Sequence, residues 1–172
     1  MASETIPQAF VTRAAEYLTT VYVPKIKHCL DQLDDAQIWW RPNPQSNSIG
    51  NLILHLSGNA RQWILTGLGG VEDTRVRDAE FAQREVIAKD QLSDLLSSTM
   101  AEVDQTLRAL DPETLLEKRT IQGADVDVLE AIFHVTEHFS MHTGQIIMLT
   151  KMLTARDLRF YEFENGVPVH RW

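Results

Sequence analysis

Hydrophobic positions along the chain repeat with a helical period in four long segments, at about residues 8–33, 48–67, 90–110 and 125–153. In the last segment Val128, Ile132 and Val135 are separated by three or four residues, which places their side chains on one face of a helix. No stretch shows the alternation of a convincing set of strands, and no internal repeat is evident. We therefore predict an all-α protein built from four helices that pack through their apolar faces.

Several residues predict where these helices begin, end or bend. Ser48 is a typical N-cap for the second helix, and Asp111 with the proline after it ends the third. Pro24 falls inside the first pattern, where it removes a backbone donor and should kink or interrupt the helix near Tyr22.

The connections predict how the helices are arranged. About twenty residues separate the second and third helices, which is too many for a tight antiparallel turn and allows a crossover that leaves these two helices parallel. The length of 172 residues fits a single domain spanning 1–172. Its tail, from about residue 155 to 172, has aromatic residues but no clear period, so the pattern does not place it.

The composition limits which kinds of partner the protein could bind and in which cellular compartment it could work. A net charge of −8 with scattered basic residues argues against binding to nucleic acid or to an anionic membrane surface. No apolar run approaches the roughly 20 residues that span a bilayer, and the N-terminus lacks the basic start and apolar stretch of a signal peptide. The single cysteine, Cys29, excludes an intramolecular disulfide and reads as a small buried hydrophobe. We predict a soluble cytoplasmic protein.

The candidate chemistry lies in the fourth segment, where three of the six histidines fall within nine residues. His134, His138 and His142 share one helical face, and neutral imidazole is the commonest metal ligand among side chains. With a rise of about 1.5 Å per residue, His134 and His142 are about 12 Å apart, too far to bind one ion. The binding pair is therefore either His134 with His138 or His138 with His142, and a further ligand must come from elsewhere.

His55 is the best candidate for that further ligand. It lies on the apolar side of the second helix, where an imidazole without a partner would be costly. Gly58, one turn later, costs about 1 kcal/mol of helix propensity, which suggests a need for space beside His55. Together with a pair from the fourth helix, His55 would give a three-histidine site with a position open to water or substrate. A hydrogen-bonded core histidine remains the alternative.

A second motif overlaps the same histidines. His134 to His138 reads H-x-x-E-H, the inverted zinc-peptidase signature, with Glu137 as general base. That interpretation needs a later carboxylate ligand, Glu162 or Glu164, and it leaves His55 and His142 unexplained.

Several motifs together resemble the DinB/YfiT-like superfamily, and in particular a branch known only as a domain of unknown function. The resemblance covers most of the chain. It is carried by Trp39-Trp40-Arg41-Pro42-Asn43, by Asn51-x-x-x-His55-x-x-Gly58-Asn59, by Arg77 followed by Glu80-Phe81, and by His138-x-x-x-His142-x-Gly144-Gln145.

This resemblance implies a four-helix bundle of up-down-down-up topology that binds a divalent metal, usually zinc or nickel. Three-histidine sites also suit iron and copper. Carried over by position, the ligands are His55, His138 and His142. His134 becomes a neighbouring or pocket residue, in the same role as Gln145, Asn59 and Gly58. The resemblance also implies a homodimer.

Three functions remain open. The leading hypothesis is a metal-dependent enzyme, most similar to thiol S-transferases that use a low-molecular-weight thiol such as bacillithiol or mycothiol. A metal-bound water or thiolate would then be the nucleophile acting on a small-molecule substrate. The alternative is a non-catalytic, metal-stabilised binding or stress-response bundle with a protein group as fourth ligand. The third is a metal-dependent hydrolase or peptidase that uses Glu137.

Overall fold

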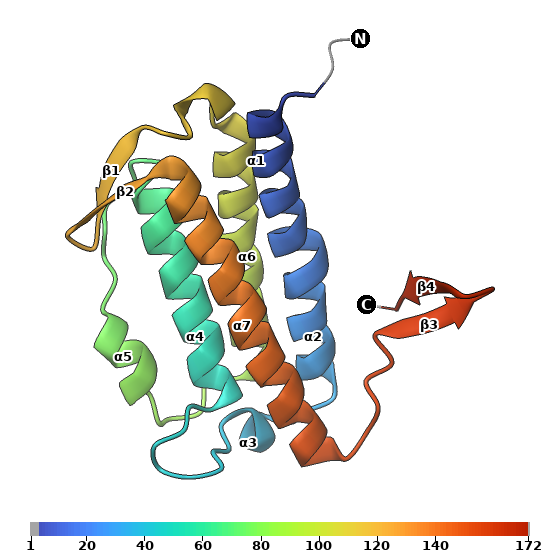
Figure 1. Cartoon of the computed structure of the whole chain (residues 1–172). Helices are drawn as coiled ribbons and strands as arrows, with labels where there is room; N and C mark the ends of the chain where they lie inside the picture. The colour runs from blue at the N-terminus through green and yellow to red at the C-terminus, as the bar shows by residue number, and fades with distance from the viewer. Residues whose placement is uncertain (1–3, 172) are drawn as a thin grey trace.

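The computed structural model describes residues 4–171, and most of them are helical. In Figure 1 four long helical segments lie side by side: α1 continued through η1 into α2, α4 continued through η2, α6, and α7. The prediction of a predominantly helical protein is confirmed. In chain order the elements are α1 (Ile6–Glu16), η1 (Tyr17–Tyr22), α2 (Val23–Asp31), α3 (Asp35–Ile38), α4 (Ile49–Ala60), η2 (Arg61–Thr66), α5 (Arg77–Ala82), α6 (Lys89–Ala109), η3 (Pro112–Thr114), β1 (Lys118–Ile121), β2 (Ala124–Asp127), α7 (Val128–Thr154), β3 (Tyr161–Glu164) and β4 (Val167–His170).

The first long segment is interrupted where Pro24 predicts it. A π-helical turn, η1, ends at Tyr22, and the N–H of Val23 bonds the carbonyl of Leu18 five residues earlier. Pro24 has no N–H and stands in the first turn of α2, a position that tolerates proline. The wider turn therefore lets the chain pass the proline without leaving the helical path.

The predicted N-cap of the second helical segment, Ser48, is present. The Ser48 hydroxyl accepts from the backbone N–H of Asn51 at 3.1 Å, and the side-chain oxygen of Asn51 accepts from the N–H of Ser48 at 3.2 Å. This reciprocal capping box fixes the start of α4. Helix α7 begins at Val128 rather than near 125, because residues 124–127 form a strand and Asp127 then caps the helix.

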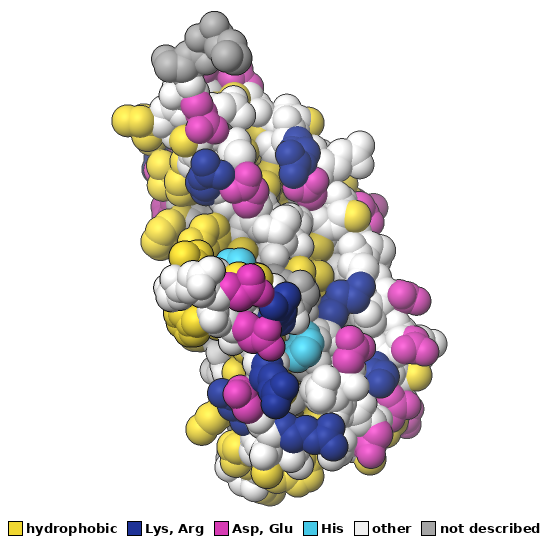
Figure 2. All heavy atoms as spheres, turned by 90° about the vertical axis from the view of Figure 1, so that its right-hand side faces the viewer, with side chains coloured by type: hydrophobic (Ala, Val, Ile, Leu, Met, Phe, Trp, Pro, Cys, Tyr) yellow, Lys and Arg dark blue, Asp and Glu magenta, His cyan; other side chains and the backbone are white. Residues whose placement is uncertain are grey.

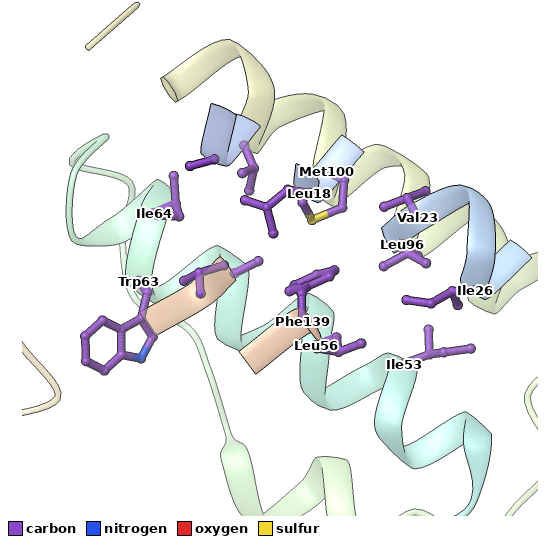
Figure 3. Packing of buried hydrophobic residues seen from close by; sticks show 14 of the residues in the cluster. Leu18, Val23, Ile26, Ile53, Leu56, Trp63, Ile64, Leu96, Met100 and Phe139 are labelled. Atoms are coloured by element: carbon purple, nitrogen blue, oxygen red, sulfur yellow. The ribbon is translucent and has the colours of Figure 1, made fainter. Parts of the chain in front are cut away.

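The core lies where the four long segments meet. Figure 3 shows side chains from each of them converging, with Phe139 of α7 near Leu18, Leu56 of α4 and Met100 of α6. All four side chains are buried, with at most 2% of their surface exposed. Cys29 is fully buried as well, and burial raises the pKa of its thiol to about 11, which agrees with the interpretation of an inert, small hydrophobe.

Two short antiparallel hairpins depart from the strictly all-α prediction. Strand β1 pairs with β2, and β3 pairs with β4. The turns place Gln122-Gly123 at φ 54° and 79° and Asn165-Gly166 at φ 53° and 79°. Two consecutive residues with positive φ match the right-handed twist of hairpin strands, and Asn-Gly is the dipeptide that favours this turn most.

The second hairpin forms most of the tail. In Figure 1 it projects beside α2, away from α4 and α5. Leu158 is buried, and its carbonyl lies 2.9 Å from Nε2 of His28, which ties the tail to α2. On the face that carries this hairpin, acidic and basic side chains are interspersed with hydrophobic ones (Figure 2). Within residues 4–171, no helix combines the length and apolar character that crossing a membrane would require.

The long connection between the second and third helical segments is ordered by its own contacts. It contains α5, which packs on α4. The indole N–H of Trp39 donates to the carbonyl of Ile87 at 3.0 Å, near the end of this connection. The connection therefore lies against α4 instead of looping free, and it brings Arg75, Glu80 and Phe81 to that helix.

Replacing Ser48 with alanine should lower the free energy of unfolding by about 1–2 kcal/mol, because the buried first turn of α4 loses its capping hydroxyl. Urea unfolding at neutral pH measures this change. The matched control is Thr5→Ala at the cap of α1, where the hydrogen bond is exposed and 3.4 Å long and the loss should be smaller. Equal losses in both variants would contradict a special role for the Ser48 cap.

Candidate metal centre

The fold brings together three histidines that are far apart in the sequence. His55 comes from α4, and His138 and His142 come from consecutive turns of α7. The Nε2 atom of His138 lies 3.0 Å from Nε2 of His55 and 2.8 Å from Nε2 of His142. Each side chain offers one ring nitrogen as a ligand atom, and these three atoms lie within 4.8 Å of one another. All three residues are buried.

Hydrogen bonds on the far side of two rings fix which nitrogen faces the centre. Nδ1 of His55 lies 2.9 Å from the carboxylate Oε2 of Glu80, and Nδ1 of His142 lies 2.8 Å from the amide Oε1 of Gln145. Both oxygens can only accept, so each Nδ1 is assigned as the donor; for His55 the carboxylate at 2.9 Å is a closer partner than Nη2 of Arg75, which lies 3.2 Å away. A neutral ring in this tautomer points the lone pair of Nε2 toward the centre.

This arrangement fits a metal ion. A tetrahedral ion with metal–nitrogen bonds near 2.0–2.1 Å holds its ligand nitrogens about 3.3 Å apart, slightly wider than the two separations from His138 Nε2 given above. If His55 and His142 both point lone pairs inward, a hydrogen on Nε2 of His138 is the one donor available to two acceptors. A cation would instead bind all three nitrogens at once. Carboxylate or amide partners on the outer nitrogen are also the usual support of metal-binding histidines.

A buried ion pair holds Glu80 in place. Arg75 donates to Glu80 through Nε at 2.8 Å and through Nη2 at 3.0 Å, and its Nη1 donates to Gln62 at 2.9 Å. The side chains of Arg75 and Glu80 are only 4% and 11% exposed. Such a two-pronged contact orients the carboxylate as well as neutralising it, and so it sets the direction of the His55 ring.

Helix α4 holds the backbone of Glu80 too. The side-chain nitrogen of Asn51 donates to the carbonyl of Glu80 at 2.7 Å and to that of Gln83 at 3.2 Å. Asn51 and His55 are four residues apart, so they lie on one face of the helix and both contact the same residue of α5.

Gly58 provides the space for this arrangement. A methyl group added there would overlap the Glu80 carboxylate and come within 3.1 Å of Nε of Arg75. The predicted need for space beside His55 is therefore real, and the group that occupies the space is Glu80.

Burial shifts the pKa values around the centre. Burial, followed by the nearby charges of His142 and His55, lowers the pKa of His138 from 6.5 to about 3. Burial also lowers the pKa of His142, against the hydrogen bond with Gln145 that raises it. Burial alone would raise the pKa of Glu80, but its hydrogen bonds with His55 and Arg75 outweigh burial and the pKa is lowered. At neutral pH His138 and His142 are therefore neutral, as metal ligands must be.

His134 lies beside the three-histidine cluster and outside it. Its Nε2 lies 3.2 Å from the side-chain nitrogen of Asn59. Its ring packs against Trp63 at a tilt of 34°, with centroids 4.0 Å apart, and stacks on His138 with centroids 5.4 Å apart. Burial lowers the pKa of His134. The structure thus places His134 and Asn59 in contact with each other beside the cluster.

The outer nitrogen of His138 differs from those of the other two histidines. Its Nδ1 is buried, and within residues 4–171 it has no hydrogen-bond partner. His55, in contrast, has a further contact besides its hydrogen bond, because the ring of Phe81 packs on it with centroids 4.5 Å apart. The cluster is thus held firmly at His55 and His142 and less firmly at His138.

The residues of the inverted-peptidase motif do not converge. Glu162 and Glu164 lie on β3, where both accept from Arg171 at 2.8 Å, and Glu137 is exposed. Within residues 4–171, the group of side chains that could hold a metal contains His55, His138 and His142 and includes neither His134 nor a glutamate. The alternative with Glu137 as general base therefore has no third ligand.

Sequence reasoning missed two residues of the site. Glu80 entered only as part of a motif without a role, and Arg75 was not singled out. Both stand in the connection between α4 and α6, where no periodicity relates a residue to its neighbours in space. The one available signal was Gly58, because a glycine inside a helix indicates that another group lies close to it. The glycine does not indicate which group that is.

The chain has the helical fold of a DinB-like protein. Two solved structures share the fold: a conserved protein from Enterococcus faecalis (TM-score 0.68, 18% identity, 84% of this chain and 97% of that chain); and a DinB-like protein from Bacillus cereus (TM-score 0.66, 18% identity, 88% of this chain and 95% of that chain). The family model described as "Protein of unknown function (DUF1572)" matches residues 6–166, so the chain belongs to that family, and the predicted membership of a branch of unknown function with a DinB-like fold is confirmed. No curated protein matches the chain.

Replacing Glu80 with glutamine should weaken zinc binding about 10- to 100-fold, because His55 loses the charged partner that orients it. Competition with a chromophoric chelator measures the affinity. Glu85→Gln, an exposed change in the same connection, serves as the control and should leave the affinity unchanged. Equal affinities in wild type and Glu80→Gln would refute the positioning role.

The metal-free protein should lose stability as the pH falls from about 6.5 to about 5, measured by urea unfolding after chelator treatment. Histidines of the unfolded chain take up protons in this range with an ordinary pKa, whereas His138 in the fold resists protonation. The unfolded state therefore binds more protons, and acidification favours it. His138→Gln should flatten this slope, while His170→Gln, at an exposed position, should not. An unchanged slope in His138→Gln would count against the depressed pKa.

Proposed function

We propose that this protein is a divalent-metal-dependent enzyme of the thiol S-transferase type, with zinc or nickel held by His55, His138 and His142. The observation that carries the proposal is the convergence of three Nε2 atoms, two of them on rings whose Nδ1 atoms bond Glu80 and Gln145. Iron and copper suit the same donor set. When bound, the ion supplies a Lewis acid and lowers the pKa of a coordinated thiol.

The residues of the chain have separable tasks in this proposal. The three histidines would hold the ion, and Glu80 with Arg75 and Gln145 would keep two of the rings in the binding orientation. Three ligands from residues 4–171 leave a fourth tetrahedral position for a small molecule, which supports an enzyme over a bundle closed by a fourth protein ligand. The fold also supports the up-down-down-up order, with α4 and α6 as the parallel pair joined by the connection that contains α5.

Metal content is the first test. His55→Ala should abolish stoichiometric zinc or nickel in the purified protein, measured by elemental analysis, because two histidines on one helix hold an ion far more weakly than three. His170→Ala, an exposed change outside the cluster, should retain the metal. Unchanged metal content in His55→Ala would remove the proposed site.

Thiol chemistry is tested separately with 1-chloro-2,4-dinitrobenzene and bacillithiol, glutathione or cysteine. The thiolate attacks the ring carbon, a carbon–sulfur bond forms and chloride leaves, so absorbance reports the product. A rate that chelation abolishes and added zinc or nickel restores would support the transferase. Metal binding without any such rate would favour the non-catalytic, metal-stabilised bundle.

The homodimer stays a proposal as well. The outward face of α7 exposes Phe133, Met141 and Met148, with 60%, 46% and 61% of their surface accessible. Exposed apolar residues on one face of a helix support a contact between copies, which sedimentation velocity would detect.

A further inference from the structure

A cavity adjoins the metal centre. It has a volume of about 390 Å³ and is bounded by α4, α5, α6 and the segment before α5. We call it the α4–α6 pocket. Arg75, Glu80 and Gly58 line it, whereas His55, His138 and His142 do not. The volume lies in the range of small-molecule sites, so the pocket is large enough for a ligand of its own.

The lining contains two arginines, Arg61 and Arg75, and two carboxylates, Asp73 and Glu80, so its charges balance. Arg75 and Glu80 neutralise each other, and Arg61 lies 3.5 Å from Glu102. Asp73 accepts from Gln62 at 2.7 Å and from the backbone of Arg75 at 3.0 Å. An ionic ligand would lose its hydration and meet a lining whose charges already balance and whose charged groups already have hydrogen-bond or ion-pair partners, so the pocket favours an uncharged one.

The apolar lining is the larger part of the wall. Leu54, Ala79, Ile87, Leu95 and Val76 all contribute to it. Val76 and Leu95 are 67% and 39% exposed, unusually high for apolar residues that line a cavity. Covering these side chains would remove apolar surface from water and favour an occupant with an apolar body.

One polar group of the pocket lacks a partner. Ser57 lines the cavity and is only 4% exposed. Its hydroxyl is buried and makes no hydrogen bond within residues 4–171. A buried hydroxyl in this state is costly, and a ligand that donates to it or accepts from it would recover the loss.

We propose that the α4–α6 pocket binds an uncharged small molecule with an apolar body of one or two rings and a hydroxyl, amide or carbonyl group that hydrogen-bonds Ser57. This site is separate from the metal centre, and the two share the wall formed by Arg75, Glu80 and Gly58.

The ligand class is tested with 2-naphthol and 2-naphthoate at pH 7, two probes of nearly equal shape that differ in charge. Isothermal titration calorimetry should show binding of 2-naphthol and at least tenfold weaker binding of 2-naphthoate. Equal affinities would overturn the uncharged class, and no binding of 2-naphthol would overturn the pocket as a site for such molecules.

The hydrogen bond is tested with Ser57→Ala. This variant should bind 2-naphthol about 5- to 10-fold more weakly than wild type, with an unchanged circular dichroism spectrum. Ser98→Ala, an exposed change on α6 outside the pocket, should bind like wild type. Unchanged affinity in Ser57→Ala would overturn the assigned contact.

Chelator treatment distinguishes this site from the metal centre. The metal-free protein should still bind 2-naphthol, because none of the pocket residues is a proposed ligand. Loss of binding on chelation would place the probe at the metal and overturn the proposal. Retained metal with no binding of 2-naphthol would instead leave the metal proposal standing and remove this one.

Discussion

The paired side chains of Arg75 and Glu80 connect the parts of the molecule that matter for its chemistry. A carboxylate this deeply buried needs a countercharge, and Arg75 supplies it through two hydrogen bonds. Glu80 in turn bonds His55, while Asn51 holds its backbone. Helix α5 has six residues, too few to be stable alone. It keeps its place because one face of α4 contacts both the main chain and the side chain of Glu80, so the metal centre and the crossover depend on the same contacts.

The three-histidine cluster is a costly arrangement that a cation would relieve. Burial and mutual proximity keep His138 and His142 from protonation, and the outer bonds of His55 and His142 direct lone pairs inward. His138 adds an outer nitrogen without a partner. Cores optimised for stability avoid such features, whereas binding sites retain them because the ligand repays the cost. The same reasoning separates His134, whose ring stacks on Trp63 and needs no ion.

The helical elements and part of the site could be predicted from the sequence. Most features set by residues close together in the chain were predicted, whereas those set by distant contacts were not. Helical periodicity and caps such as Ser48 located the long helices, since these signals act within one turn. The rise of a helix excluded His134 and His142 from one ion, but only the family resemblance chose His138 with His142. The hairpins were missed although Asn165-Gly166 is a strong turn signal. Glu80 could not be placed, because its position depends on a crossover with no period of its own.

Gly58 is the residue on which both proposed sites depend. Its missing side chain admits the Glu80 carboxylate against α4, and that carboxylate orients His55 on one side and lines the α4–α6 pocket on the other. A side chain at position 58 would therefore disturb metal and ligand together. Ser57 lines only the pocket, and Gln145 bonds only a ligand of the metal centre. Substitutions at Ser57 or Gln145 can therefore alter one site without the other. Substitutions in the common wall would alter both sites, because both depend on the position of α5.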